Sequence, residues 1–124
     1  MRTILLNVEK EKVEVIEVGN RLDDWYEALG CEMVEIDARR IGGRRFLVMC
    51  DEEGLLKGEP KISAISDMGD IMFVGNLMFF NDGEDGELAG LSEDDIKHLM
   101  RFIQRMSTRN FPQGYPMLTQ CEWR

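Results

Sequence analysis

The chain has 124 residues, of which 24 are acidic and 15 are basic, and its formal net charge is −9 at pH 7. A hydrophobic content of 44% and a charged content of 31% exclude a disordered chain and are typical of one soluble globular domain. The excess of acids argues against direct binding to nucleic acid, which depends on positive charge, and leaves a basic protein partner open. The longest apolar run, residues 71–80, is too short to cross a membrane.

The N-terminus and the cysteines both indicate a cytoplasmic protein. Met1 leads directly into a short apolar run without a cleavage-type segment, so we expect no export signal. The three cysteines, Cys31, Cys50 and Cys121, are an odd number without a C-x-x-C pair, and the single histidine, His98, is far from them in sequence. This spacing predicts reduced, mostly buried thiols and no zinc site.

The first element that we expect is an antiparallel hairpin. Residues 3–8 and 13–18 are rich in β-branched side chains, and a short charged connector separates them. Alternation in the second strand predicts that Val13, Val15 and Val18 face inward.

A short amphipathic helix is expected over residues 21–29. Asn20 has a side chain suited to the N-cap position, and two aspartates occupy the first turn, where the helix dipole favours negative charge. Gly30 follows as a left-handed C-cap. The apolar residues recur at helical spacing and form a single stripe, which comprises Leu22, Trp25, Tyr26 and Leu29.

A second hairpin is predicted around residues 39–45, which read RRIGGRR. Gly42 and Gly43 suit a two-residue turn between strands over 33–41 and 45–50. In this register Arg40 lies opposite Arg45, a like-charge pair that is unfavourable by roughly 0.2–1 kcal/mol.

The arginines of this hairpin have two interpretations. They form either a solvated tip that discourages edge-to-edge association or a contact surface for an acidic group. The acidic group could belong to nucleic acid, to a partner protein or to a second copy of this chain, which would then self-associate through the hairpin. The candidate partner-binding residues are Arg39, Arg40, Arg44 and Arg45.

The middle of the chain is expected to hold a loop and one central strand. Residues 55–69 contain glycine and proline with little periodicity, which predicts a loop with one turn of helix near 62–65. Residues 70–80 are apolar on both faces, as expected of a central strand, and Gly75-Asn76 suggests a bulge.

The acidic, glycine-rich stretch 81–87 predicts a solvated hairpin loop, although its carboxylates are also of the kind that bind a divalent cation. The helix–loop–helix calcium template does not fit, because Ser92 stands where that template requires a glutamate. The candidate ligands in this alternative are Asp82, Glu84, Asp85 and Glu87.

A second helix is predicted over residues 93–106. Ser92 and Asp95 have the spacing of an N-terminal capping box, and His98 falls on the polar side, where we expect it to be exposed. Its apolar stripe comprises Ile96, Leu99, Met100, Ile103 and Met106. Residues 107–124 contain prolines and glycine that interrupt any pattern, and they predict an irregular C-terminal extension.

No catalytic motif is present. The sequence has no H-E-x-x-H, no G-x-S-x-G and no phosphate-binding loop, so we predict no catalytic residue and no cofactor. The sequence therefore favours a non-enzymatic protein over an enzyme.

Six segments occur in the same order as in a known family. They are TILLNV (3–8), VEVIEV (13–18), Gly30-Cys31, DEEGLLKGEP (51–60), GDIMFVG (69–75) and LSEDDI (91–96). As a set they resemble the phage and mobile-element proteins grouped as domain of unknown function 3846. Asp51 stands where that family usually has asparagine. The resemblance implies an origin in a phage, prophage or conjugative element and a bacterial cytoplasm, and it supplies no catalytic or binding residue.

Together these elements predict an α+β fold, with a single domain over residues 1–106. We expect a mostly antiparallel sheet of about five strands, with the helices 21–29 and 93–106 packed on one face. The expected function is that of a non-enzymatic accessory protein that binds a host protein, and proteins that bind nucleic acid are among the candidates. The alternative is a small domain that binds a ligand or divalent metal through residues 82–87.

Overall fold

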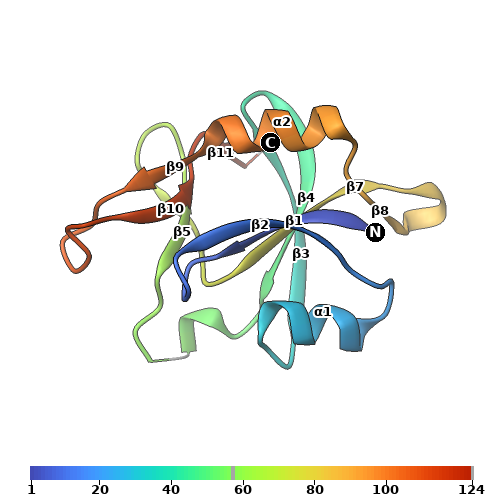
Figure 1. The fold of residues 1–124 in the computed structure, drawn as a ribbon, viewed down its shortest axis with the longest axis horizontal. Helices are drawn as coiled ribbons and strands as arrows, with labels where there is room; N and C mark the ends of the chain where they lie inside the picture. The colour runs from blue at the N-terminus through green and yellow to red at the C-terminus, as the bar shows by residue number, and fades with distance from the viewer. Residues whose placement is uncertain (57, 124) are drawn as a thin grey trace.

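The computed structural model describes residues 1–56 and 58–123, which fold into a single α+β domain (Figure 1). Two sheets are present in this part of the chain, one of seven strands and one of four. The strands of the larger sheet are β1 (Arg2–Asn7), β2 (Lys12–Glu17), β3 (Val34–Ile41), β4 (Arg44–Asp51), β7 (Leu77–Asp82), β8 (Leu88–Ala89) and β11 (Cys121–Glu122).

The smaller sheet consists of β5 (Ile62–Ile65), β6 (Ile71–Val74), β9 (Ile103–Met106) and β10 (Tyr115–Leu118). The helices are α1 (Leu22–Leu29) and α2 (Glu93–Phe102), with short 3-10 turns over Gly54–Leu56 and Glu84–Gly86. Neither α-helix in the described residues is long and apolar enough to span a membrane.

The strand order is β11-β3-β4-β7-β1-β2 in the larger sheet, with β8 beside β7, and β6-β5-β10-β9 in the smaller one. All neighbouring strands are antiparallel except β5 and β10. The α+β class and the antiparallel pairing are therefore confirmed. The single sheet of about five strands is wrong, because residues 62–74 and 103–118 form a sheet of their own.

The two helices lie on opposite faces of the larger sheet, so their predicted packing on one face is also wrong. Along β7, Leu77 and Phe79 belong to one hydrophobic cluster, while Met78 and Phe80 belong to the other. The smaller sheet and α2 cover the first cluster, and α1 covers the second. Figure 1 shows α2 and α1 on either side of β1 and β2. Two apolar faces on one strand each need a cover, which accounts for this arrangement.

Both predicted hairpins are present. The strands β1 and β2 pair antiparallel, and β3 pairs with β4 in the predicted register, with Arg40 opposite Arg45. One detail differs, because Val15 is 44% exposed rather than facing the core. It lies on β2, which is an edge strand of the larger sheet.

The start of α1 differs from the prediction, whereas its end agrees. Arg21, not Asn20, occupies the N-cap position, and it makes no side-chain capping bond. Instead, the indole Nε1 of Trp25 donates to the carbonyl oxygen of Gly19 at 2.9 Å, which ties the preceding chain to the helix. Gly30 adopts the left-handed conformation expected of the C-cap, with φ of 71°.

Residues 62–80 contain more strand than the sequence predicts. The expected turn of helix near 62–65 is the strand β5, and the expected single strand over 70–80 is divided into β6 and β7 in different sheets. Gly75 has φ of +77°, a conformation that glycine adopts easily, and it allows the chain to leave one sheet for the other. The buried Asn76 holds the crossing, because its Oδ1 accepts from Val8 N at 3.0 Å.

The C-terminal part is more regular than predicted. The helix α2 ends at Phe102 rather than at 106, and the β-branched Ile103 begins β9 in an extended conformation. Residues 107–124 are not an irregular extension, because they contribute β10 and β11. Pro116 is tolerated in β10, since only Leu118 of that strand pairs with β5.

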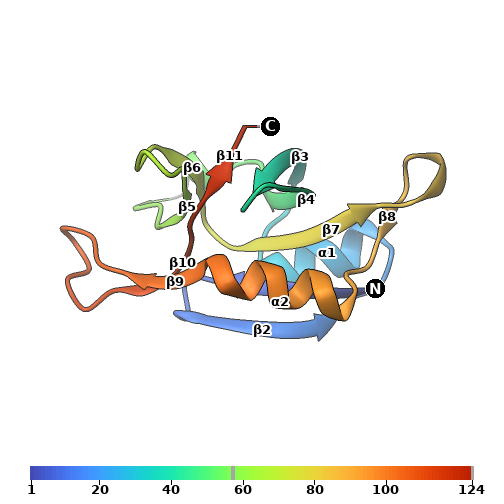
Figure 2. The same cartoon turned by 90° about the horizontal axis from the view of Figure 1, so that it is seen from above.

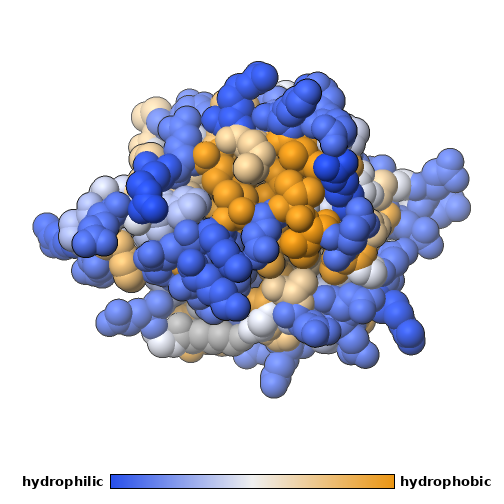
Figure 3. Space-filling model, in the orientation of Figure 1, coloured by the Kyte–Doolittle hydropathy of each residue, from blue (hydrophilic) through white to orange (hydrophobic). Residues whose placement is uncertain are grey.

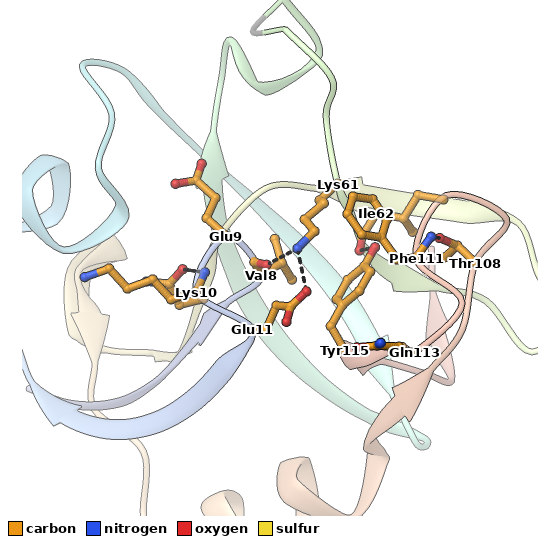
Figure 4. A network of polar contacts seen from close by, with 12 residues as sticks. Val8, Glu9, Lys10, Glu11, Lys61, Ile62, Thr108, Phe111, Gln113 and Tyr115 are labelled. Carbon is orange, nitrogen blue, oxygen red and sulfur yellow. Dashed lines mark hydrogen bonds and ion pairs between the residues drawn. The ribbon is translucent and has the colours of Figure 1, made fainter.

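Lys61 joins the two sheets (Figure 4). Its Nζ donates to the carbonyl oxygen of Val8 at 3.0 Å and to Glu11 at 3.1 Å. The same ammonium lies 4.4 Å from the ring centre of Phe111 and 4.7 Å from that of Tyr115. The side chain is only 15% exposed, so these contacts replace much of its hydration.

We predict that Lys61→Met lowers the free energy of unfolding by about 2 kcal/mol, because it leaves the Val8 carbonyl and Glu11 without their charged donor. Urea unfolding followed by circular dichroism measures the change. Lys97→Met, at an exposed position of α2, is the matched control and should change stability by less than about 0.5 kcal/mol. Equal effects of the two substitutions would contradict a bridging role for Lys61.

Candidate functional site

Three of the four candidate arginines, Arg39, Arg44 and Arg45, lie at ion-pair distance from carboxylates of the same chain. Arg44 donates to Asp94 at 3.0 Å and to Asp95 at 3.4 Å, in the first turn of α2. Arg45 pairs with Asp82, at the end of β7. The hairpin of β3 and β4 is thereby linked to both the second helix and the acidic loop. Any acidic partner at these two arginines would compete with these internal ion pairs.

Nearby acceptors offset the repulsion between Arg40 and Arg45, which lie opposite each other in the hairpin. Arg45 has its carboxylate in Asp82, and Arg40 donates from Nη1 to the carbonyl oxygen of Gly43 at 2.9 Å. Within the described residues, Arg40 has no carboxylate at ion-pair distance. Its charge is therefore the one most available to a ligand.

The tip of the hairpin packs on α2. Gly42 lies against the Phe102 ring so closely that a Cβ atom would overlap it. His98 bonds through Nε2 to the carbonyl oxygen of Ile41 at 2.8 Å, and its ring lies between Phe46 and Phe102. His98 is therefore half-buried, and the predicted exposed position is wrong, because this side of α2 faces the hairpin rather than solvent.

The carboxylates of the acidic loop differ in their ion pairing. All four candidate ligands are exposed, but Asp82 is paired with Arg45, whereas no ion pair is found among the described residues for the other three: Glu84, Asp85 and Glu87. Among the residues that the structure describes, no three His, Cys, Asp or Glu side chains come together in a way that could hold a metal ion.

A pocket of about 220 Å³ lies where β3, β4 and β6 meet, and its wall is acidic. Glu35, Asp37, Asp51 and Glu52 line it, together with Arg39 and the apolar residues of β6. The negative charge of Asp37, followed by burial, the charge of Glu52 and a hydrogen bond with Asp37, raises the pKa of Glu35. Sequence reasoning did not identify this pocket. The available signal was the alternation that places Glu35 and Asp37 on the same side of β3, next to the end of β4.

A second feature is apolar. Figure 3 shows hydrophobic side chains gathered in the middle of the face that carries β2 and α2. Val15 of β2 and Met100 of α2 are 44% and 41% exposed. Three neighbouring residues are half-buried and pack on one cluster: Val13, two residues before Val15 on β2, Ile96, one turn before Met100 on α2, and Ile103, at the start of β9. We refer to Val13, Val15, Ile96, Met100 and Ile103 as the β2–α2 patch.

Asp95 should contribute stability to the fold that is lost at low pH. Burial alone would raise its pKa, but hydrogen bonds from Ser92 and Asn81 and the charge of Arg44 outweigh that effect and lower it. A carboxyl group with a lowered pKa in the folded state stabilises the fold above about pH 4, and this contribution is lost as the pH falls through the folded-state pKa.

We predict that Asp95→Asn is less stable than the wild type at neutral pH and that the difference shrinks below about pH 4. Urea unfolding at a series of pH values measures it. Asp94→Asn is the control, because the Asp94 side chain is 81% exposed and its replacement should change stability by less than about 0.5 kcal/mol. Parallel stability curves for the wild type and Asp95→Asn would contradict the assignment.

The three cysteines are buried thiols, as the sequence predicts. Burial, followed by the charges of Glu35, Asp37 and Asp51, raises the pKa of Cys50 to about 12. Burial also raises the pKa of Cys121 to about 12. Because the thiolate is the reactive form, neither residue should act as a nucleophile in the folded protein.

We predict that a disulfide reagent at pH 8 labels Cys50 and Cys121 only after unfolding, when all three thiols react. Absorbance of the released thiolate, with and without denaturant, measures the count. Rapid labelling of Cys50 in the folded protein would show that the acidic pocket opens down to its thiol.

Comparison with known proteins agrees with the resemblance seen in the sequence. Neither a curated protein nor a solved structure matches the chain. One family model, Domain of unknown function (DUF3846), matches residues 1–105. The match therefore spans every element from β1 to α2, including β5 and β6 of the smaller sheet, and most of β9. The chain belongs to the DUF3846 family.

Proposed function

We propose that this protein is a non-enzymatic protein-binding module that engages its partner through the β2–α2 patch. The observation that carries the proposal is the exposed apolar surface formed by Val15 and Met100 with their half-buried neighbours. Apolar surface gathered in one place on a small domain is typical of a protein interface.

The backbone of β2 supports the same proposal. This strand pairs with β1 on one side, and it ends the strand order of the larger sheet. An edge strand can accept an extended segment of another protein through main-chain hydrogen bonds. The charged residues of β2, Lys12, Glu14 and Glu17, oppose uncontrolled pairing between copies and favour a partner of suitable charge.

Charge around the patch favours a basic partner. Glu17 continues the row of Val13 and Val15 along β2, and Glu93 begins the row of Ile96 and Met100 along α2. Both glutamate side chains are more than 70% exposed, although each already pairs with a cation of the chain, Glu17 with the N-terminal ammonium and Glu93 with Arg2. With a net charge of −9, the whole protein would also attract a positively charged partner.

The biological setting follows from the family resemblance. A phage, prophage or conjugative-element protein would act in the bacterial cytoplasm, where a host protein that itself binds nucleic acid is a suitable basic partner. The alternative of a ligand or metal at residues 82–87 has less support, because Arg45 already occupies Asp82. We therefore propose an interaction with a host protein.

Capture of partners from a bacterial lysate, with quantification by mass spectrometry, tests the proposal. We predict that Val15→Glu and Met100→Glu each reduce recovery of a basic protein at least about tenfold, because a charge is placed in the centre of the apolar contact. Met68→Glu adds the same charge at a position that is 83% exposed and belongs to the turn between β5 and β6, so it should retain the partner.

Thermal melting should show that all three variants fold like the wild type. Equal recovery by the wild type and the patch variants would overturn the proposal. A wild-type dimer in sedimentation, abolished by Val15→Glu, would also overturn it, because a second copy of the chain would then occupy the patch.

A further inference from the structure

We infer that a second site, separate from the β2–α2 patch, binds a phosphate monoester attached to a flat ring, as in a nucleoside monophosphate. The site is a hollow lined by Ala38, Arg39, Arg40, Arg45 and Trp123. Figure 2 shows β11 and β2 on opposite sides of the molecule, so this hollow lies far from the patch. The inference does not depend on the proposed function.

Arg39 supplies a positive charge whose hydrogen bonds are only partly satisfied, since Nη1 donates to the carbonyl oxygen of Ala38 at 2.8 Å. Its guanidinium carbon lies 4.5 Å from the ring centre of Trp123 and 5.0 Å from that of Phe73, and its side chain is 11% exposed. The carboxylate of Asp37 is 3.8 Å away, which is long for a hydrogen bond. Nε is buried and has no hydrogen-bond partner in the described residues. A buried charge with an unused donor favours an added acceptor that carries negative charge.

Two more arginines line the same hollow. Arg40 and Arg45 are directly opposite in the register of β3 and β4. Arg45 pairs with Asp82, whereas Arg40 contacts only the carbonyl oxygen of Gly43. A phosphate monoester carries a charge of about −1.5 to −2 and offers three acceptor oxygens, which would relieve the repulsion between the arginines.

Trp123 provides the surface for the flat ring of the ligand. Its side chain is 66% exposed, although it is one of the largest apolar groups of the chain. Arg39 holds it in place through the cation–π contact. Exposed aromatic rings beside arginines are the arrangement on which nucleobases stack.

The size of the hollow limits the ligand. It measures about 260 Å³, which is at the small end for a ligand site and suits one nucleotide unit. The unit could be a free mononucleotide or the phosphorylated 5′ end of a strand, since both present the same phosphate and base.

Titration with adenosine 5′-monophosphate, followed by NMR, tests the inference. The chain has two tryptophans and therefore two indole N–H signals, which Trp123→Phe assigns. We expect a saturable shift of the Trp123 signal, while the signal of Trp25, whose indole is bonded to Gly19 next to α1, stays in place. Adenosine and inorganic phosphate should each bind at least about tenfold more weakly, because each lacks one half of the recognised group.

Two variants that each remove one positive charge test whether Arg40 contacts the phosphate. Arg40→Gln should weaken binding about tenfold by removing charge-assisted hydrogen bonds, whereas Arg101→Gln, on the exposed side of α2, should leave it unchanged. Both positions are exposed, so both variants should fold. A 5′-phosphorylated oligonucleotide that binds at least about tenfold more tightly than the mononucleotide would assign the strand end, and equal binding would assign the free nucleotide.

Three results would overturn the inference. The first is no shift of the Trp123 signal at millimolar mononucleotide, and the second is an equal shift of both indole signals. The third is equal loss of affinity in Arg40→Gln and Arg101→Gln, which would show that the ligand responds only to the overall charge of the protein.

Discussion

The burial of β7 on both faces is the constraint on which the rest of the structure depends. Four consecutive residues, Leu77 to Phe80, are completely buried, and they point alternately to the two sides of the larger sheet. Such a strand is stable only if each face is covered. The cover on one face is α1, and on the other it is α2 with the smaller sheet. Thr3 strengthens the strand from β1, because its hydroxyl donates to the carbonyl oxygen of Phe79 at 2.6 Å.

The charges of this acidic protein are used mainly to hold its parts together. Arg44 and Arg45 attach the hairpin of β3 and β4 to the start of α2 and to the end of β7. Lys61 performs the same task between the two sheets. Where acids gather without enough cations, as at Glu35 and Asp37, the pKa of Glu35 rises. The remaining exposed acids would give the partner-binding face its preference for positive charge.

The two proposed sites lie at opposite edges of the larger sheet. The β2–α2 patch is at the edge formed by β2, and the arginine hollow is at the edge formed by β3 and β11. The strands between them form one continuous hydrogen-bonded sheet. A protein and a nucleotide could therefore be bound at the same time without competing for the same residues.

Local pattern alone determined the elements whose stabilising interactions lie close together in sequence. The hairpin register around Gly42-Gly43, the C-cap at Gly30 and the capping box of Ser92 and Asp95 all depend on residues within a few positions, and all are present. The family and the α+β class also followed from the order of such local elements. The acidic pocket was partly foreseeable, since the alternation along β3 already placed Glu35 beside Asp37.

Only the tertiary structure decided the features that depend on residues far apart in the chain. The division of 71–80 between two sheets follows from the contact of Asn76 with Val8, and the regular C-terminal strands follow from their pairing with β3, β5 and β9. The pairing of Arg45 with Asp82 and the stacking of Arg39 on Trp123 are likewise long-range contacts. Sequence periodicity reports which side of a strand or helix is apolar. It does not report which distant segment covers that side, because the cover is selected by packing and charge in the folded chain.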